Sequence, residues 1–459
     1  MKSPVVLYRS LRALALPLLA MGGVLSARAD NPDLNFSGMG WAQYGQVVQS
    51  TDTGQARHYS GNSIQSTGAQ LLLRVKVSEN LEGAAGLGVL ENHFMSDRGT
   101  VGRIQLIENP YIAEASFTYS FWKTGNSQLK IRGGLFPYDY NPDVKNLGLY
   151  LLRGPVHPGI LLSGFETKAV LPIANTLGFQ LHHEWGGFSQ DFILNSETDL
   201  YPYYDISPAY VANYRATPAF RFGAGVNFYR YLAVEPKLTS PNYLSPAERE
   251  INPADKSPYA RNYIYVDSAT KDTTFISFAG IKLMANASFD PKSMFGGLAM
   301  LGPEDLKIYG EIALLGLEND KAYREIYGDY LHRMPVMVGF NIPTLRGLDN
   351  LSLEVEWYGA KFKDDLSRYQ TGPAYYPSPL PVSNVDPVAS IFDVEGNLKR
   401  DNWKWSLYGA RTIQHHFKIS FQVANDHFRP GGIVNGPSQE AVFSTLEDWY
   451  WMTKIAYFF

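Results

Sequence analysis

The residues most capable of chemistry in this sequence are two histidine groups, His182-His183-Glu184 and His415-His416. Imidazole and carboxylate are ligands for zinc, and a histidine held by a carboxylate is the general base of many hydrolases. Residues around His182 alternate between polar and apolar, so only His182 and Glu184 share a face, and no serine motif accompanies either group. We therefore expect no metal site, no cofactor and no enzyme activity, and keep a hydrolase as the lesser alternative.

Charged residues form a second set with chemical potential, because they recur at every second position of otherwise apolar segments. Arg74 and Lys76 share one face of their segment, and Glu354 and Glu356 share one face of another. Such a segment has one face suited to water and one suited to hydrocarbon. The candidates for a wet interior are Arg74, Lys76, Lys130, Arg132, Lys307, Glu311, Glu354, Glu356, Lys404, Lys418 and Lys454.

The elements that position these charges are strands, because apolar residues repeat with period two along the whole chain. The clearest segments, Tyr111–Trp122, Leu351–Phe362 and the last one, are each about as long as the ~9–11 residues that a tilted strand needs to cross a bilayer. Sixteen strands are predicted: Leu34–Val48, Gln65–Val77, Leu81–Phe94, Tyr111–Trp122, Gln128–Tyr138, Ile160–Leu171, Thr176–Asn195, Ala209–Arg215, Ala219–Val234, Thr273–Phe289, Leu306–Leu317, Met334–Ile342, Leu351–Phe362, Asn402–Ile413, Phe417–Phe428 and Asp448–Phe459. For Thr176–Asn195, a hairpin bent at Gly186-Gly187 is the alternative.

The links between these strands alternate between short and long. Short links follow strands two, four, six and eight, at 78–80, 123–127, 172–175 and 216–218, whereas 49–64, 235–272 and 363–401 are long. One link, 290–305, is long on the short side. Turns at one rim and loops at the other are typical of an up-and-down barrel in an outer membrane. The predicted fold class is an all-β, antiparallel, up-and-down transmembrane β-barrel of about 16 strands, within 14 to 18.

Composition and the amino terminus agree with an exported barrel. The 459 residues include no cysteine, which excludes a disulfide scaffold. The chain has 40 basic and 44 acidic residues, and this lack of a positive excess disfavours a nucleic-acid partner. Residues 1–29 are a predicted signal peptide, since basic residues precede the apolar stretch 13–25 and Ala27-Arg28-Ala29 has the small-x-small form of a cleavage site. Cleavage near Ala29 would leave 30–459 as a single barrel domain.

The signal peptide, the strand parity and the aromatic last strand together resemble the porins of Gram-negative bacteria, over essentially the whole mature chain. The resemblance implies an outer-membrane protein embedded in lipid, a homotrimer, and a passive water-filled channel for small hydrophilic solutes. Sugars are candidates because tyrosine-rich loops lie at 201–205 and 374–381. The resemblance to porins also implies that the barrel-assembly machinery recognises Ile455, Tyr457 and Phe459 in the last strand.

The resemblance gives the third long loop, 139–159, a specific role. In porins the loop after strand five folds inward and narrows the channel, which makes Asp139, Asp143, Lys145 and Arg153 the constriction candidates. We expect a short helix over Val144–Arg153, with apolar residues packed on the inner wall. An outward cap or a contact between protomers is the alternative for this loop. A surface glycan-binding or structural barrel with a plugged lumen is the alternative for the whole chain.

Overall fold

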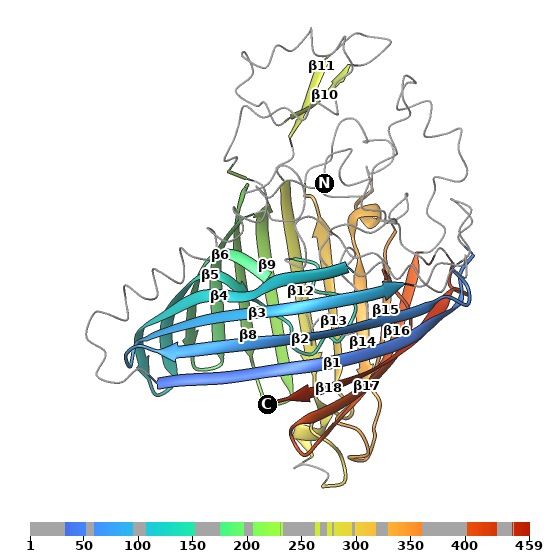
Figure 1. The fold of residues 1–459 in the computed structure, drawn as a ribbon. Helices are drawn as coiled ribbons and strands as arrows, with labels where there is room; N and C mark the ends of the chain where they lie inside the picture. Colours follow the sequence, from blue (N-terminus) through green and yellow to red (C-terminus); the bar gives the residue numbers. More distant parts are fainter. Residues whose placement is uncertain are drawn as a thin grey trace, which may run out of the picture.

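The structure, a computed structural model, is a closed ring of sixteen antiparallel strands (Figure 1). It describes residues 33–51, 59–94, 107–151, 175–196, 205–229, 231–232, 262–266, 273–277, 280–295, 299–317, 329–359, 402–428, 443 and 445–459. Neighbouring barrel strands are consecutive in the chain except where β12 pairs with β9, and β1 pairs with both β2 and β18 to close the ring. The predicted antiparallel barrel and its strand number are confirmed.

The barrel strands differ in length around the ring, from 18 residues in β4 to 6 in β14. Their bounds are β1 Asp33–Gln49, β2 Ser63–Lys76, β3 Leu81–Phe94, β4 Ile107–Thr124, β5 Ser127–Pro137, β6 Asn175–Trp185, β7 Phe188–Ser196, β8 Ile206–Arg215, β9 Phe220–Tyr229, β12 Gly280–Phe289, β13 Ile308–Leu315, β14 Val336–Asn341, β15 Asn350–Trp357, β16 Trp403–Ile413, β17 Phe417–Asn425 and β18 Trp449–Phe458. A separate hairpin pairs β10 Asn262–Val266 with β11 Thr273–Ser277. Two short 3-10 helices are η1 Pro291–Met294 and η3 Tyr330–Arg333.

The two faces of the barrel wall differ chemically, as the alternation requires. In β15, Ser352, Glu354 and Glu356 are buried on the inner face, whereas Leu353 is exposed on the outer face. The same division recurs around the ring, with exposed outward residues such as Leu71, Leu87, Phe117, Phe179, Phe192, Leu283, Val338, Ile419 and Ile455. The barrel therefore has an apolar exterior and a polar interior, the reverse of a soluble protein.

Two strand predictions were wrong in their extent. Thr176–Asn195 forms two strands, β6 and β7, because Gly186, with φ +58°, turns the chain in a two-residue link, so the alternative of a hairpin bent at Gly186-Gly187 is confirmed. Only the second part of Thr273–Phe289 belongs to the barrel, since β11 pairs with β10 and β12 begins at Gly280. The predicted strand Ile160–Leu171 lies outside the described residues, as does the signal peptide, 1–29.

One rim of the barrel carries the short links, at 77–80, 125–126, 186–187, 216–219 and 414–416. The expected exception, the link from 290 to 307, lies at this rim and contains η1. Of the predicted short link at 172–175, only Asn175 is described, and it begins β6; the β6–β7 hairpin turns at 186–187. Among the described residues, no helix is long and apolar enough to cross a membrane.

The last strand closes the barrel beside the first. Gly38 and Phe459 exchange backbone hydrogen bonds of 2.9 and 3.0 Å, which extend the β1–β18 ladder to the final residue. Ile455, Tyr457 and Phe459 are exposed, and Tyr457 packs on Phe417 at a ring-centroid distance of 4.9 Å. Recognition of these three side chains by an assembly machinery stays a prediction.

The barrel wall should be sensitive at Gly134 in β5. This glycine has φ +114°, and a Cβ placed there would lie 2.1 Å from the Ala115 carbonyl oxygen of β4. Strain in such a conformation costs about 1–3 kcal/mol before the clash is counted, so Gly134→Ala should lower the folded fraction in a heat-modifiability gel assay. Gly40→Ala is the matched control, since its Cβ would meet nothing closer than 3.9 Å. Equal folded fractions for the two variants would contradict the expected clash.

Candidate functional site

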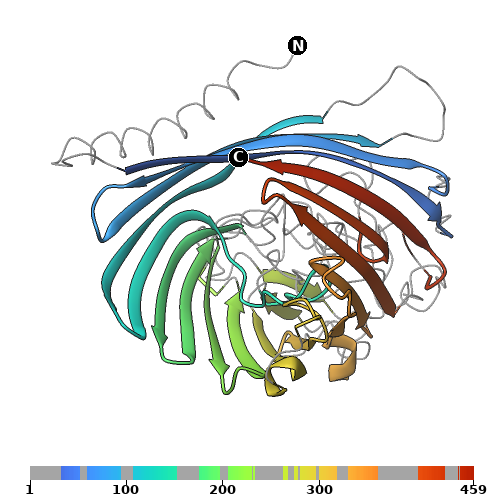
Figure 2. The ribbon, with the colours of Figure 1, turned by 90° about the horizontal axis from the view of Figure 1, so that it is seen from below.

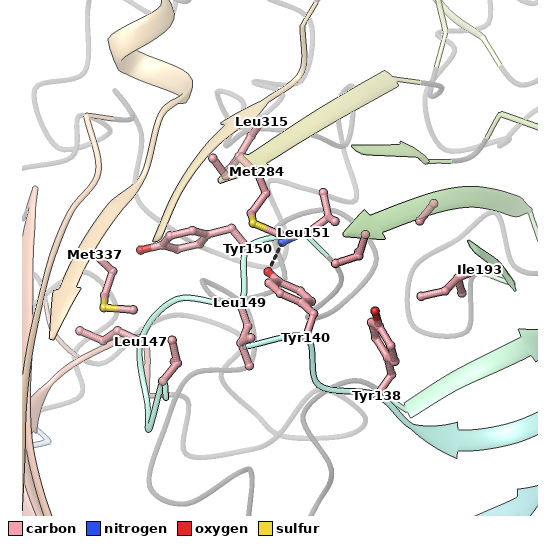
Figure 3. Close-up of a cluster of buried hydrophobic side chains, with 14 of the residues drawn as sticks. Tyr138, Tyr140, Leu147, Leu149, Tyr150, Leu151, Ile193, Met284, Leu315 and Met337 are labelled. Carbon is pink, nitrogen blue, oxygen red and sulfur yellow. Dashed lines mark hydrogen bonds between the residues drawn. The ribbon is translucent and has the colours of Figure 1, made fainter. Parts of the chain in front are cut away.

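Residues 138–151, here called the inner segment, leave β5 and enter the interior of the ring. Figure 2 shows this teal segment crossing inside the strands toward β12–β15. Its apolar side chains Leu149, Tyr150 and Leu151 are buried in one cluster with Met284 of β12 and Met337 of β14 (Figure 3). The sequence offered two alternatives for this loop, packing on the inner wall or facing outward. The structure has the apolar side chains of the described part buried against the inner wall.

The expected helix over Val144–Arg153 does not form in the part that is described. Residues 144–151 adopt turns and bends, and Gly148 and Leu149 have φ values of +88° and +60°. A right-handed helix cannot include positive φ values. The irregular backbone leaves several N–H groups without helical partners, and these groups point at carboxylates of the wall.

Glu354 of β15 is the main acceptor for the inner segment. The backbone N–H groups of Lys145, Asn146 and Leu147 donate to its carboxylate at 2.5, 2.8 and 2.8 Å, and Tyr309 Oη donates at 2.9 Å. Hydrogen bonds to a charged group contribute about 1.5–3 kcal/mol each. Three consecutive amides on one buried carboxylate therefore hold this turn of the segment against the wall.

Glu311 of β13 holds the segment at two other points. Its Oε1 accepts from Tyr140 Oη at 2.7 Å and from the Tyr150 N–H at 2.8 Å, and its Oε2 accepts from Asn141 Nδ2 at 3.0 Å. Tyr140 Oη in turn accepts from the Leu151 N–H at 2.9 Å. Both ends of the inner segment are thus attached to one wall carboxylate.

Asp143 is the acidic residue of the segment with cationic partners. Its carboxylate lies 2.7 Å from Arg221 of β9 and 3.3 Å from Lys307 beside β13. Burial alone would raise the pKa of Asp143, but the charges of Arg221 and Lys307 outweigh it and hold this pKa below its ordinary value. Lys145 lies at a longer distance, 3.6 Å, from Glu304. The segment therefore carries three ion pairs with the wall and its links, two at Asp143 and a longer one at Lys145.

The constriction candidates divide into three environments. Asp143 is buried, Lys145 is half-buried, and Asp139 is exposed while it accepts from the Asn141 N–H at 3.0 Å. Arg153 lies outside the described residues. The three described candidates belong to one segment inside the barrel, and their role in a constriction stays a prediction.

The predicted lumen charges fall into two groups with opposite solvation. Glu311, Glu354, Glu356, Lys404 and Lys454 are buried, with no more than 3% of the residue exposed. In contrast, the side chains of Arg74 on β2 and Arg132 on β5 are 43% and 23% exposed, and Arg74 pairs with Glu82 of β3, which was not among the predicted charges and is 47% exposed. Lys76 is also exposed, and Lys130, Lys307 and Lys418 are half-buried. Solvated charge therefore lies mainly on the β2–β5 side, away from the inner segment.

Sequence reasoning missed several partners of these charges. Glu114 of β4, which is buried, lies 3.2 Å from Arg132 and 3.6 Å from Arg74, so it joins two of the predicted lumen residues. Arg221 lies between the outward Phe220 and Phe222. The period-two pattern of β4 and β9 contains both residues and would have placed them on the inner face.

Each histidine group has a separate place in the described part of the chain. His182 Nδ1 lies 2.7 Å from Asp191 and its Nε2 lies 3.9 Å from Glu184. His415 and His416 occupy the short link between β16 and β17. Among the described residues, no group of three or more His, Cys, Asp or Glu could hold a metal ion.

Comparisons with known proteins identify no sequence relative. No protein-family model and no curated protein matches the chain. Among solved structures, a mutant porin of Rh. blastica is similar at a TM-score of 0.43 and 6% identity, over 93% of this chain and 100% of that one. Salmonella typhi OmpF in complex with daunomycin is similar at a TM-score of 0.46 and 9% identity, over 93% and 97%. These TM-scores and identities are too low to carry an argument, so the assignment of a barrel depends on the strand pairing of this chain itself.

Replacing Glu354 should release the inner segment. Glu354→Gln removes the charge and turns one acceptor oxygen into a donor, so the three amides lose about 1.5–3 kcal/mol or more of attachment. Because the chain has no cysteine, a Val144→Cys reporter can be labelled with a maleimide without background. Its labelling rate should rise about tenfold or more in the Glu354→Gln background.

Glu82→Gln is the matched control for this measurement, since Glu82 pairs with Arg74 at 3.3 Å on an exposed face and makes no recorded contact with the inner segment. It should leave the labelling rate unchanged. A rate that rises equally in both variants would show that Glu354 does not hold the segment.

The Asp143 ion pairs predict a pH dependence of stability. Because the folded-state pKa lies below the ordinary value of 3.8, the stabilisation is fully present above that value and is lost as the pH falls through the folded pKa. Asp143→Asn should therefore lower the melting temperature above about pH 5, and the difference from wild type should shrink below pH 3.8. Circular dichroism melts across this range check it, and a difference that stays constant with pH would contradict it.

Proposed function

We propose that the chain is a porin-type diffusion channel of the outer membrane, through which small hydrophilic solutes or ions pass without an energy source. The closed barrel with its apolar exterior supports a wall that spans lipid, since the buried charged residues of the strands, such as Glu311, Glu354 and Lys404, lie on the inner face. Sixteen strands enclose more space than wall side chains can fill. The observation that carries the proposal is the inner segment, which the wall carboxylates hold inside this space, where it would narrow the passage.

The path for solutes would run beside the β2–β5 wall. Arg74 and Glu82 on that wall keep 43% and 47% of their side chains exposed, whereas the carboxylates that the inner segment covers, Glu311, Glu354 and Glu356, are buried. A water-filled passage solvates the charges that border it, and a packed segment excludes water from those beneath it. Both signs of charge are present along this wall, which suits hydrophilic solutes in general.

The remaining properties follow from this function. The proposed location is the outer membrane of a Gram-negative bacterium after cleavage near Ala29, with Ile455, Tyr457 and Phe459 as the assembly signal and a homotrimer as the assembly. The tyrosine-rich loops that favour sugars, 201–205 and 374–381, lie outside the described residues except for Asp205. Swelling rates of liposomes across a graded series of sugars and anions would define the solute range.

Conductance in planar bilayers tests the function directly. The purified barrel should give stepwise current increases at a fixed voltage. Asp143→Asn leaves Arg221 and Lys307 without their shared anion and should shift the ion selectivity toward anions, whereas Lys145→Gln should shift it toward cations. Reversal potentials in a salt gradient measure both shifts.

Lys123→Gln, on an exposed residue near the short-link rim, is the charge-matched control and should leave the reversal potential unchanged. A stable barrel that carries no current would reject the channel and favour a structural or glycan-binding barrel. Currents with unchanged selectivity in both segment variants would show that the inner segment does not border the passage.

A further inference from the structure

A second segment of the chain meets the inner segment inside the barrel. Asp426 and His427 follow β17 directly, and neither is exposed. Asp426 Oδ2 accepts a hydrogen bond from Asn146 Nδ2 of the inner segment at 2.7 Å. Asp426 therefore contacts the inner segment directly, whereas His427 contacts it through one other side chain.

The intermediate is Glu356 of β15, which is also fully buried. His427 Nε2 lies 2.6 Å from Glu356 Oε1, and Tyr150 Oη of the inner segment donates to Glu356 Oε2 at 2.7 Å. One carboxylate thus joins a histidine of the β17–β18 link to a tyrosine of the β5–β6 link. The backbone N–H of the same tyrosine donates to Glu311, so Tyr150 is held at both ends.

The surroundings of this pair contain further charges. Lys404 of β16 lies opposite Glu356 in the strand register, and its Nζ donates to the Phe443 carbonyl oxygen at 3.0 Å. Asp426 also accepts from Tyr450 Oη at 2.8 Å and from Gln422 Nε2 at 3.1 Å. A carboxylate in such a buried place costs free energy unless donors surround it. His427 is one of the donors that keep Glu356 in place.

We propose that His427 is a positioning residue for the inner segment: by donating from Nε2 to Glu356, it orients the carboxylate that receives the Tyr150 hydroxyl. The effect on conduction rests on the proposed channel function, but the effect on the position of the segment does not. The start of the β17–β18 link and the inner segment are therefore coupled parts of one constriction, although they lie 277 residues apart between Tyr150 and His427.

The test combines two variants in the Val144→Cys reporter. His427→Ala removes the donor and should raise the maleimide labelling rate about tenfold, whereas His427→Gln retains a side-chain N–H and should restore the rate to within about twofold of wild type. Tyr150→Phe removes the hydroxyl and should raise the rate by itself. Because both changes act through Glu356, His427→Ala should add little in the Tyr150→Phe background.

His416→Ala, in the exposed link between β16 and β17, is the control and should leave the rate unchanged. Fully additive effects of the two substitutions, or the same rate for His427→Ala and wild type, would overturn the proposal. A melting temperature measured for each variant separates release of the segment from loss of the barrel. Labelling that follows the expected pattern in a barrel without current would reject the channel and retain the positioning role.

Discussion

The structure depends on buried carboxylates in the barrel wall that need hydrogen-bond donors. Glu311, Glu354 and Glu356 lie on the inner faces of β13 and β15, where water does not reach them. An unpaired carboxylate in such a place is strongly destabilising. The donors come from the backbone and tyrosines of the inner segment, so wall and segment stabilise each other. Neither side of this arrangement is expected to keep its conformation without the other.

This attachment makes the interior asymmetric. The inner segment packs on the wall from β7 to β15, and the residues that follow β17 join it through Asp426 and His427. On the wall formed by β2–β5, the side chains of Arg74 and Glu82 stay partly exposed. Arg74 and Arg132 both form ion pairs with Glu114 on this wall. The inward carboxylates of β13 and β15, in contrast, are buried beneath the inner segment. The short strands β13, β14 and β15 lie on the side where the inner segment packs.

The predictions from sequence succeeded where one local signal decides the outcome. Period-two alternation placed Glu354 and Glu356 on one face of their strand, and the structure has both buried on the inner face of β15. Alternation was a poorer guide to where a strand ends, since Gly186 turns the chain within the predicted strand Thr176–Asn195, where only the glycine pair marked the turn. It also could not show that β11 pairs with β10 and lies outside the barrel, because partner choice is not encoded in a strand's own pattern.

The sequence by itself determined the architecture and the chemistry of the two wall faces, because a closed sheet between hydrocarbon and an interior of different polarity imposes a period of two at every strand. Only the tertiary structure decided which inward charges meet water. The contacts of Glu354 with the amides of 145–147, and of Glu356 with Tyr150 and His427, join residues more than 70 positions apart. Hydrogen bonds to backbone amides carry no side-chain signature, so no residue pattern records them, and the fold alone brings these groups together.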